Sequence, residues 1–338
     1  MFLLPPSRTG WKPGGKRASE RLESDYLDWA LEGFSGYLAA DELYDGPYCV
    51  VSIVDTHSFK RLFYQVLDHE ATQADILAFF QRFRAILDAR GLAVRAITTD
   101  GASCYIPAIP DVFGPIPHQV CQFHILGHLT EAVLHAVAKV RKQLAAKLPK
   151  LPHGRAPKRL RGLVQRHHRL QQKLSDLYTH RYLFVQHHLT PSERNTLQHI
   201  TRGWPQLRTL RDIMDEVYRI FDRRCRTETA LAKLARLRRR VQRFTTVGKT
   251  LQTLFTANVE KALTFLDDRL LASTSNAVER ANRRHRKMQK TVYRVRTQIH
   301  IANRIAMDLF RDTQAQGRDR TLAQLHHARA SPATRWSL

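Results

Sequence analysis

Three acidic residues stand at positions where a fold could bring them together. Asp41 lies in a run that predicts a strand over residues 37–43, and Asp100 directly follows the β-branched run 94–99. Glu279 comes just after a cluster of helix-capping residues, one turn into a predicted helix. The carboxyl end of a strand in an open α/β sheet is where reacting groups gather. We therefore take Asp100 as the centre of a candidate site.

The carboxylates of Asp41 and Asp100 would repel each other on neighbouring strands unless a cation lay between them. Their hard oxygen ligands suit Mg²⁺ or Mn²⁺. Two such ions about 3.5–4 Å apart can activate a hydroxyl and stabilise the leaving oxygen in a phosphoryl transfer. In this interpretation Asp100 bridges both ions, Asp41 binds one or both, and Glu279 completes the second.

Each acid also has an ordinary structural explanation. Asp41 could be a solvated acid, with Glu42 or Asp45 as the ligand in its place. Asp100 could simply cap the turn that follows it. Asn276 and the glutamate three residues later have the spacing of a capping box, which by itself would account for that glutamate. The residues alone leave these alternatives open.

The composition points to a polyanionic partner. The 338 residues include 55 Lys and Arg against 30 Asp and Glu, a formal net charge of +25, and nucleic acid is the first candidate. The four cysteines are widely spaced, which favours neither a disulfide framework nor a zinc ribbon. We find no signal peptide and no run of about 20 apolar residues. We therefore expect a cytoplasmic protein without membrane contact.

The first part of the chain predicts a mixed sheet. Residues 1–35 form a basic arm and a short helix, and a catalytic core begins at residue 36 and continues to residue 124. The predicted strands are 37–43, 48–54, 59–67, 94–99 and 118–123, with helices over 72–90 and near 102–109. Three antiparallel strands, a crossover helix and then parallel strands is the order of the ribonuclease H-like fold, an α/β class.

Helical periodicity replaces the strand patterns between residues 125 and 270, which we interpret as a large all-α insertion. The predicted helices there are 125–149, 157–188, 191–202, 205–225, 228–243 and 248–268. Thr190 to Glu193 is a helix start, and the apolar stripe from Leu207 to Phe221 is typical of a core. Closing helices that carry Glu279 follow over residues 271–315, before a weakly ordered tail over 316–338.

Four motifs in order resemble those of the DDE transposases, and more closely the Mutator-like and related transposases of bacterial insertion sequences. They are Asp41-Glu42-Leu43-Tyr44, Ile97-Thr98-Thr99-Asp100, Cys121-Gln122-Phe123-His124 and Ser275-Asn276-Ala277-Val278-Glu279-Arg280. The resemblance covers residues 36–315. It implies a ribonuclease H-like core interrupted by a helical insertion, metal-dependent cleavage and joining of DNA at element ends, and a catalytic triad of Asp41, Asp100 and Glu279.

One departure from that family concerns the recognition of element ends. Only about 36 residues precede the first motif, and they contain no Cys/His cluster for a zinc-binding domain. We expect either a truncated copy or DNA binding by the insertion and the basic arms.

Cys121 and His124 have two interpretations. With His128 and His118 they could form part of a zinc site. The resemblance implies instead that they support the acids, with His124 meeting a DNA phosphate or orienting Asp100. Asn276 is a candidate for the same supporting role.

The predicted last long helix carries many cations that could hold a DNA backbone. From residue 280 to residue 296 there are eight Lys or Arg and no acid. Our DNA-binding candidates are Arg280, Arg283, Arg284, Arg286, Lys287 and Lys290. Trp204, between a glycine and a proline, could stack on a flipped base, or could be an aromatic residue buried at a helix start.

The residues and the resemblance together predict a transposase that cleaves DNA and transfers strands with Mg²⁺ or Mn²⁺. The resemblance further implies a homo-oligomer on DNA, associated with the bacterial nucleoid. Two alternatives remain: an inactive or domesticated DNA-binding remnant, and a structure-selective nuclease on the same fold.

Overall fold

The structure is a computed structural model that describes residues 25–151, 160–242, 251–290 and 297–314. The predicted tail and most of the predicted N-terminal arm lie outside these residues. The chain divides into two compact units. Unit 1 comprises Met1–His118 and Thr274–Leu338, and unit 2 comprises Gln119–Ser273.

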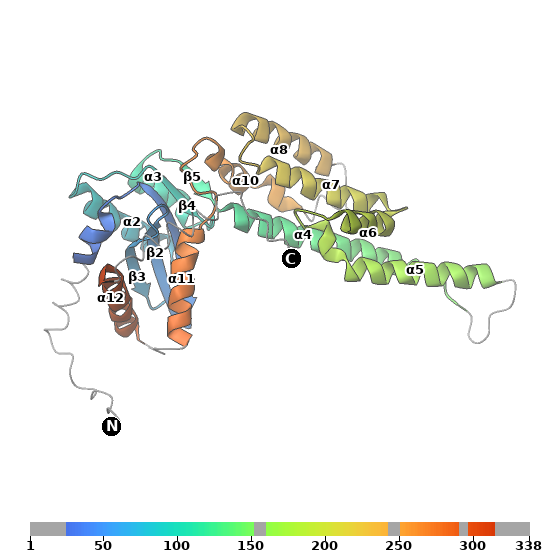
Figure 1. Cartoon of the computed structure of the whole chain (residues 1–338), viewed down its shortest axis with the longest axis horizontal. Coiled ribbons are helices and arrows are strands. Elements are labelled where there is room, and N and C mark those ends of the chain that lie inside the picture. Colours follow the sequence, from blue (N-terminus) through green and yellow to red (C-terminus); the bar gives the residue numbers. More distant parts are fainter. Residues whose placement is uncertain (1–24, 152–159, 243–250, 291–296, 315–338) are drawn as a thin grey trace, which may run out of the picture. The chain divides into compact units, whose positions relative to one another are not determined.

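A five-stranded mixed sheet carries the candidate site (Figure 1). Its strands are β1 (Tyr37–Asp45), β2 (Tyr48–Asp55), β3 (Arg61–Leu67), β4 (Ala96–Thr99) and β5 (His118–Val120). The order across the sheet is β3-β2-β1-β4-β5. β1 to β3 pair antiparallel, and β4 pairs parallel to β1, as the crossover helix predicts. The predicted mixed α/β fold of ribonuclease H type is confirmed.

Helices α2 (Gln73–Asp88) and α3 (Tyr105–Phe113) bury the main core. A capping box between Thr72 and Asp75 begins α2, and the apolar face of this helix presents aromatic rings to the sheet. Phe63 of β3 stacks on Phe79 and Phe83, with ring centroids 5.0 and 5.8 Å apart. This packing fixes the crossover that leads into β4.

The last two described helices also belong to unit 1. Helix α11 (Asn276–Met288) packs through Ala277 and Val278 against Ala39 of β1 and Val54 of β2, in a small separate cluster. Helix α12 (Gln298–Gln314) packs against β3. The Tyr64 hydroxyl of β3 donates a hydrogen bond to the Ala302 carbonyl of this helix.

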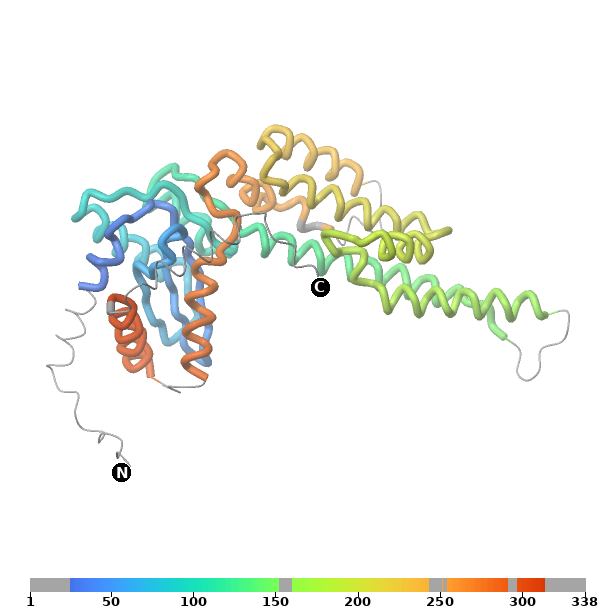
Figure 2. Tube along the Cα trace, viewed as in Figure 1, coloured from blue at the N-terminus to red at the C-terminus, as the bar shows by residue number. Residues whose placement is uncertain are grey.

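Unit 2 is helical throughout its described part after β5, as Figure 2 traces. Helix α4 contacts both α5 and α7, and α7 contacts α8. The elements are α4 (Gln122–Ala145), α5 (Arg161–Thr179), η2 (Arg181–Phe184), α6 (Pro191–Thr201), α7 (Pro205–Ile220), α8 (Thr227–Gln242), η3 (Gln252–Phe255), α10 (Ala257–Lys261) and η4 (Thr264–Leu266). Nowhere in the described residues does a helix reach the length and apolar character that a bilayer crossing requires.

The helix starts and the α7 stripe of unit 2 agree with the sequence prediction. Thr190 and Glu193 form a capping box with Pro191 in the first turn, and the stripe residues Leu207, Leu210, Met214, Val217 and Phe221 are buried. Several predicted boundaries are wrong, among them those of the helix 157–188, whose described part consists of α5 and the short helix η2. The predicted strand 118–123 ends at Val120 because α4 begins at Gln122. The predicted helix 248–268 is, over its described residues, three short helical turns rather than one helix.

Gly36 closes the junction between β1 and β4 and gives a first prediction. It has φ +83°, its carbonyl accepts from the Arg95 amide, and an added Cβ would lie 3.1 Å from the Ala93 carbonyl oxygen. Gly36→Ala should therefore lower the free energy of unfolding by more than Gly91→Ala. Gly91 has φ +64° but open space around the position, so its substitution isolates the conformational cost of about 1–2 kcal/mol. Urea unfolding of both variants measures the difference, and equal losses would contradict it.

Candidate active site

The parallel register of β1 and β4 places Asp41 beside Asp100. Leu38 pairs with Ile97 and Ala39 with Thr98, so two further steps along both strands bring the two aspartates level. Asp41 lies in the middle of β1 and Asp100 directly after β4. Ligand oxygens of Asp41, Glu42 and Asp100 lie within 4.8 Å of one another. The sheet therefore brings together the two aspartates singled out from the sequence and adds Glu42.

Helix α11 covers the face of β1 that carries Asp41. Ala39 and Asp41 share this face, because successive side chains of a strand point to opposite sides of the sheet. Ala39 packs against α11, and the Asn282 amide of α11 donates to Asp41 Oδ2 at 2.9 Å. Glu279 lies one helical turn before Asn282 and is near enough to raise the pKa of Asp41. Its carboxylate accepts from the Ser275 hydroxyl at 2.8 Å. Within the described residues, Glu279 is not part of the closest carboxylate group.

The contacts test two of the structural explanations for the acids, the turn cap at Asp100 and the capping box from Asn276. Asp100 does accept from the Ala102 amide at 2.8 Å, so it caps its turn and still faces Asp41. The capping box from Asn276 is wrong. Ser275 occupies the N-cap position and makes no capping bond to the backbone, while Asn276 is exposed. The Glu279 side chain is therefore not explained by helix capping.

Burial raises the pKa of Asp41 to about 7, with the nearby Asp100 and Glu42 carboxylates adding to the effect. The hydrogen bond from Asn282 acts in the opposite direction. Burial, followed by Asp100, also raises the pKa of Glu42. Like charges confined in a partly buried space make the ionised state of this group costly.

The wall of the carboxylate group is made by the start of α3. The Cys104 thiol lies 3.6 Å from a Glu42 carboxylate oxygen, and burial raises the pKa of this thiol to about 12. Tyr105 is fully buried, and burial, then the charges of Glu42 and Asp41, raise the pKa of its phenol well above the usual range. Both groups therefore stay protonated at neutral pH.

The donor set fits a divalent cation. Asp41, Glu42 and Asp100 offer only hard oxygen atoms, the type that Mg²⁺ and Mn²⁺ prefer. Their mutual repulsion is the property that a bound cation would relieve.

The comparisons with known proteins bear on this arrangement. The model of one protein family, the ISL3 type of DDE transposases with the description "Transposase", matches residues 48–305, which is more than half of the chain. The chain belongs to this family. No curated protein and no solved structure gave a significant match. The predicted membership among insertion-sequence transposases is confirmed, and with it an activity that acts on DNA.

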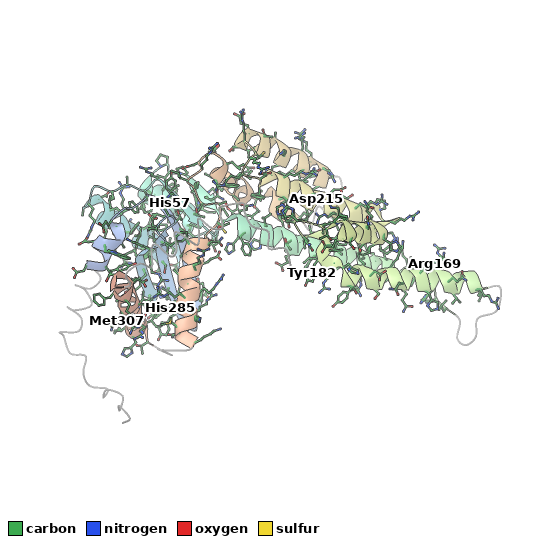
Figure 3. The ribbon with its side chains drawn as sticks, in the orientation of Figure 1. His57, Arg169, Tyr182, Asp215, His285 and Met307 are labelled. Atoms are coloured by element: carbon green, nitrogen blue, oxygen red, sulfur yellow. The ribbon has the colours of Figure 1, made fainter. Side chains whose placement is uncertain are left out.

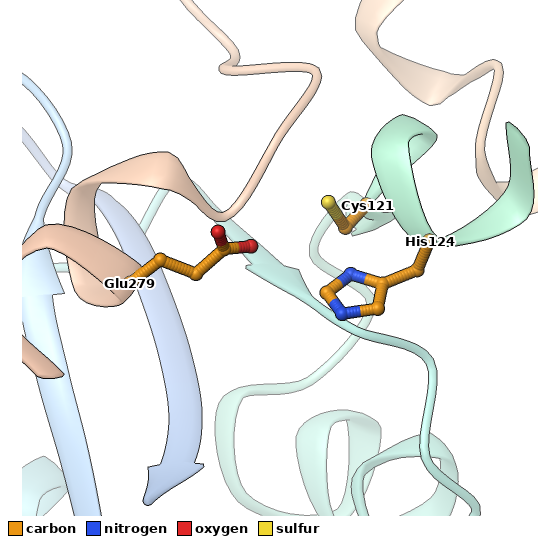
Figure 4. Close-up of side chains that lie close together, drawn as sticks. All are labelled: Cys121, His124 and Glu279. Carbon is orange, nitrogen blue, oxygen red and sulfur yellow. The ribbon is translucent and has the colours of Figure 1, made fainter. Parts of the chain in front are cut away.

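Cys121 and His124 lie at the start of α4 in unit 2, and Figure 4 shows both side chains together with that of Glu279 on α11. Cys121 is fully buried. Among the described residues, neither His118 nor His128 belongs to a close group of metal-ligating side chains, so the two histidines that the zinc interpretation added are not in place. His118 of the transposase instead lies 2.9 Å from the Thr99 hydroxyl.

The cations of α11 divide between two faces of the helix. Arg283, Arg286 and Lys287 of α11 are exposed, as is Lys290, two residues after the helix ends. In contrast, Arg284 binds both oxygens of Asp312 at 2.8 and 2.9 Å, and Arg280 lies 5.4 Å from the centroid of the Phe59 ring. Two of the six predicted DNA-binding cations thus have side-chain contacts with Asp312 and Phe59, and the other four are exposed.

Trp204 is half-buried at the start of α7, with Lys173 Nζ 5.6 Å from its ring centroid. Base stacking by this residue stays a prediction. Sequence reasoning missed Asn282, although a polar amide in phase with the packing residues Val278 and Ala281 was the available signal.

The raised pKa of Asp41 predicts a pH-dependent stability for the metal-free transposase. Between pH 3.8 and about 7 the folded state keeps a proton that the unfolded chain has lost, so stability falls as pH rises through this window. Relative to Asp41→Asn, the wild type should lose up to about 4 kcal/mol over this range. Urea unfolding in EDTA at several pH values measures the difference.

Asp68→Asn is the control for this measurement. The hydrogen bond from His69 lowers the pKa of the fully exposed Asp68. The contribution of Asp68 to stability should therefore grow as pH rises toward 3.8 and stay constant above pH 3.8. A constant difference between wild type and Asp41→Asn across the window would show that Asp41 does not carry the shift.

Proposed function

We propose that this transposase cleaves DNA and transfers strands at the ends of a mobile element, using Mg²⁺ or Mn²⁺ held by Asp41, Asp100 and Glu279. The observation that carries the proposal is the alignment of Asp41 with Asp100, together with the hydrogen bond that ties Asp41 to the helix of Glu279. The family supports the reaction class. Glu42, which lies in the closest carboxylate group, is the alternative third ligand.

Each of these side chains has a separate task in the proposed site. A divalent cation bound there would activate a water or hydroxyl and stabilise charge on the leaving oxygen. Asp41 and Asp100 would supply the carboxylates from the sheet. Asn282 would hold the Asp41 carboxylate in position, and Ser275 would do the same for Glu279.

The DNA would run along the exposed face of α11 and just past its end, where Arg283, Arg286, Lys287 and Lys290 can contact phosphates. A net charge of +25 supports a polyanionic partner of this kind. We also propose that Cys121, His124 and Asn276 support the acids, and that the transposase works as a homo-oligomer in the cytoplasm of a bacterium. The domain boundaries given from the sequence are proposed on the same basis.

Metal-dependent nicking of duplex DNA tests the catalytic assignment. Asp100→Asn, Asp41→Asn and Glu279→Gln should each lower the rate by at least about 100-fold, because each removes a ligand charge while nearly keeping shape. DNA binding without metal should stay near that of the wild type. Asp88→Asn, an exposed acid of α2 paired with Arg84, is the matched control and should keep full activity.

The outcomes separate the alternatives. Loss of nicking in Glu42→Gln but not in Glu279→Gln would move the third role to Glu42. DNA binding with no nicking in any protein would favour a DNA-binding remnant. Cleavage confined to branched DNA, with no joining of 3′ ends to a target, would favour a structure-selective nuclease.

The salt dependence of DNA binding tests the exposed face of α11. A phosphate contact contributes about 0.9 to the slope of log K against log salt concentration. The double variant Arg283→Gln with Arg286→Gln should therefore reduce the slope by roughly 2, uniformly across sequences. Arg84→Gln on α2 is the control and should leave the slope unchanged, and an unaltered slope in the double variant would remove α11 from the DNA path.

A further inference from the structure

A basic cavity lies in unit 1, beside the face of α11 that carries Arg280 and Arg284. It has a volume of about 190 Å³ and is enclosed by the helix over residues 25–31, the turn between β2 and β3, α11 and α12. The carboxylates of the candidate active site are not among its lining residues. Figure 3 labels His285, which lines this cavity from α11.

Arg61 is the unusual residue of the cavity. It is only 8% exposed, and its Nε and Nη2 have no hydrogen-bond partner. A buried guanidinium normally has all its donors satisfied, because an uncompensated buried charge costs several kcal/mol. Burial lowers the pKa of Arg61, in agreement with such a cost.

The charged residues around Arg61 favour the binding of an anion, because cations outnumber acids. Asp312 lies close to Arg61, but both its oxygens accept from Arg284. The lining residues include four cations and two acids; these are Lys60, Arg61, Arg280, Arg284, Asp308 and Asp312. Burial, followed by the charge of Arg61, lowers the pKa of His285, so this ring stays neutral and does not compete for an anion.

The turn at the cavity is held in an unfavourable backbone conformation. Phe59 has φ +58°, and it is the only non-glycine residue with positive φ in the described part of the chain. Its neighbours Ser58 and Lys60 also line the cavity. Lys60 is fixed there, since its Nζ donates to the Trp29 carbonyl at 3.1 Å. Strain of this kind collects at binding sites, where the surrounding structure maintains it.

We propose that this cavity binds a phosphate group, with Arg61 as its buried ligand and Lys60 and Ser58 at the turn. The guanidinium fork matches the oxygens of a phosphate, and the unsatisfied Nε and Nη2 of Arg61 are the pair that a bidentate contact uses. The source of the phosphate is either the DNA backbone or a free phosphate or nucleotide. The site does not depend on the proposed catalytic reaction.

Thermal unfolding without divalent cations tests the site, with inorganic phosphate compared against NaCl at equal ionic strength. About 50 mM phosphate should raise the wild-type Tm by about 5 °C, which is the shift expected for a site with a Kd of about 1 mM. Arg61→Met should have a higher Tm than the wild type in NaCl, because it removes an unpaired buried charge and keeps volume. It should also lose the response to phosphate.

Arg211→Met is the matched control. Arg211 is equally buried, at 8% exposed, but its donors are satisfied by Asp215 and by the carbonyls of Leu183 and Gln186. This variant should have a lower Tm than the wild type and keep the phosphate response. A wild-type Tm no higher in phosphate than in NaCl, or an Arg61→Met response equal to that of the wild type, would overturn the proposal.

DNA binding then identifies the source. If the backbone of DNA supplies the phosphate, Arg61→Met should reduce the salt slope of duplex binding by about 1. An unchanged slope together with a lost phosphate response assigns the site to free phosphate or a nucleotide. Nicking activity is measured separately, so failure of this site and failure of the proposed catalytic reaction give different results.

Discussion

The repulsion between carboxylates confined at one point of the sheet is the constraint on which the rest of unit 1 depends. Asp41 and Asp100 are level on adjacent parallel strands, and Glu42 lies within the same group. Without compensation such an arrangement is destabilising. Burial raises the pKa of Asp41 most, and the repulsion from Asp100 and Glu42 raises it further. The fold tolerates this arrangement because the aromatic core on α2 and α3 and the close junction at Gly36 fix both strands independently of these charges. The sheet can therefore hold acids in an arrangement that they would not adopt by themselves.

Helix α11 joins three functions in one short segment. One face packs on β1 and β2 and contacts Asp41 through Asn282, so the helix cannot shift without disturbing the acid. A second face carries exposed cations, and a third lines the phosphate cavity. Since adjacent residues of a helix point about 100° apart, neighbours such as Arg283 and Arg284 serve different surfaces. A movement of α11 on binding DNA would be transmitted to the acids through the Asn282 contact.

The sequence was sufficient for features that depend on local pattern, and insufficient where the answer depends on long-range contacts. The positions of the five strands along the chain, the capping box at Thr190 and the α7 stripe follow from periodicity and turn chemistry, which act over a few residues. Glu42 was considered only as a substitute for Asp41. Strand alternation places the side chains of these two neighbours on opposite faces, and the sequence does not reveal that Asp100 lies close to both. Asn282 and Arg61 were missed because a polar residue at a packing position has meaning only once its neighbours across the fold are known.

The position of Asp41 relative to the family match makes the geometry an independent argument for its role. The matched region starts at residue 48, after Asp41, so the family by itself does not assign this residue to the site. The register of β1 with β4 and the hydrogen bond from Asn282 come from strand pairing and helix packing instead. Both contacts lead from Asp41 to segments inside the matched region, one ending at Asp100 and the other one turn from Glu279. Asp41 is thus level with one of these residues and hydrogen-bonded to the helix that carries the other, and this geometry supports the role proposed for it.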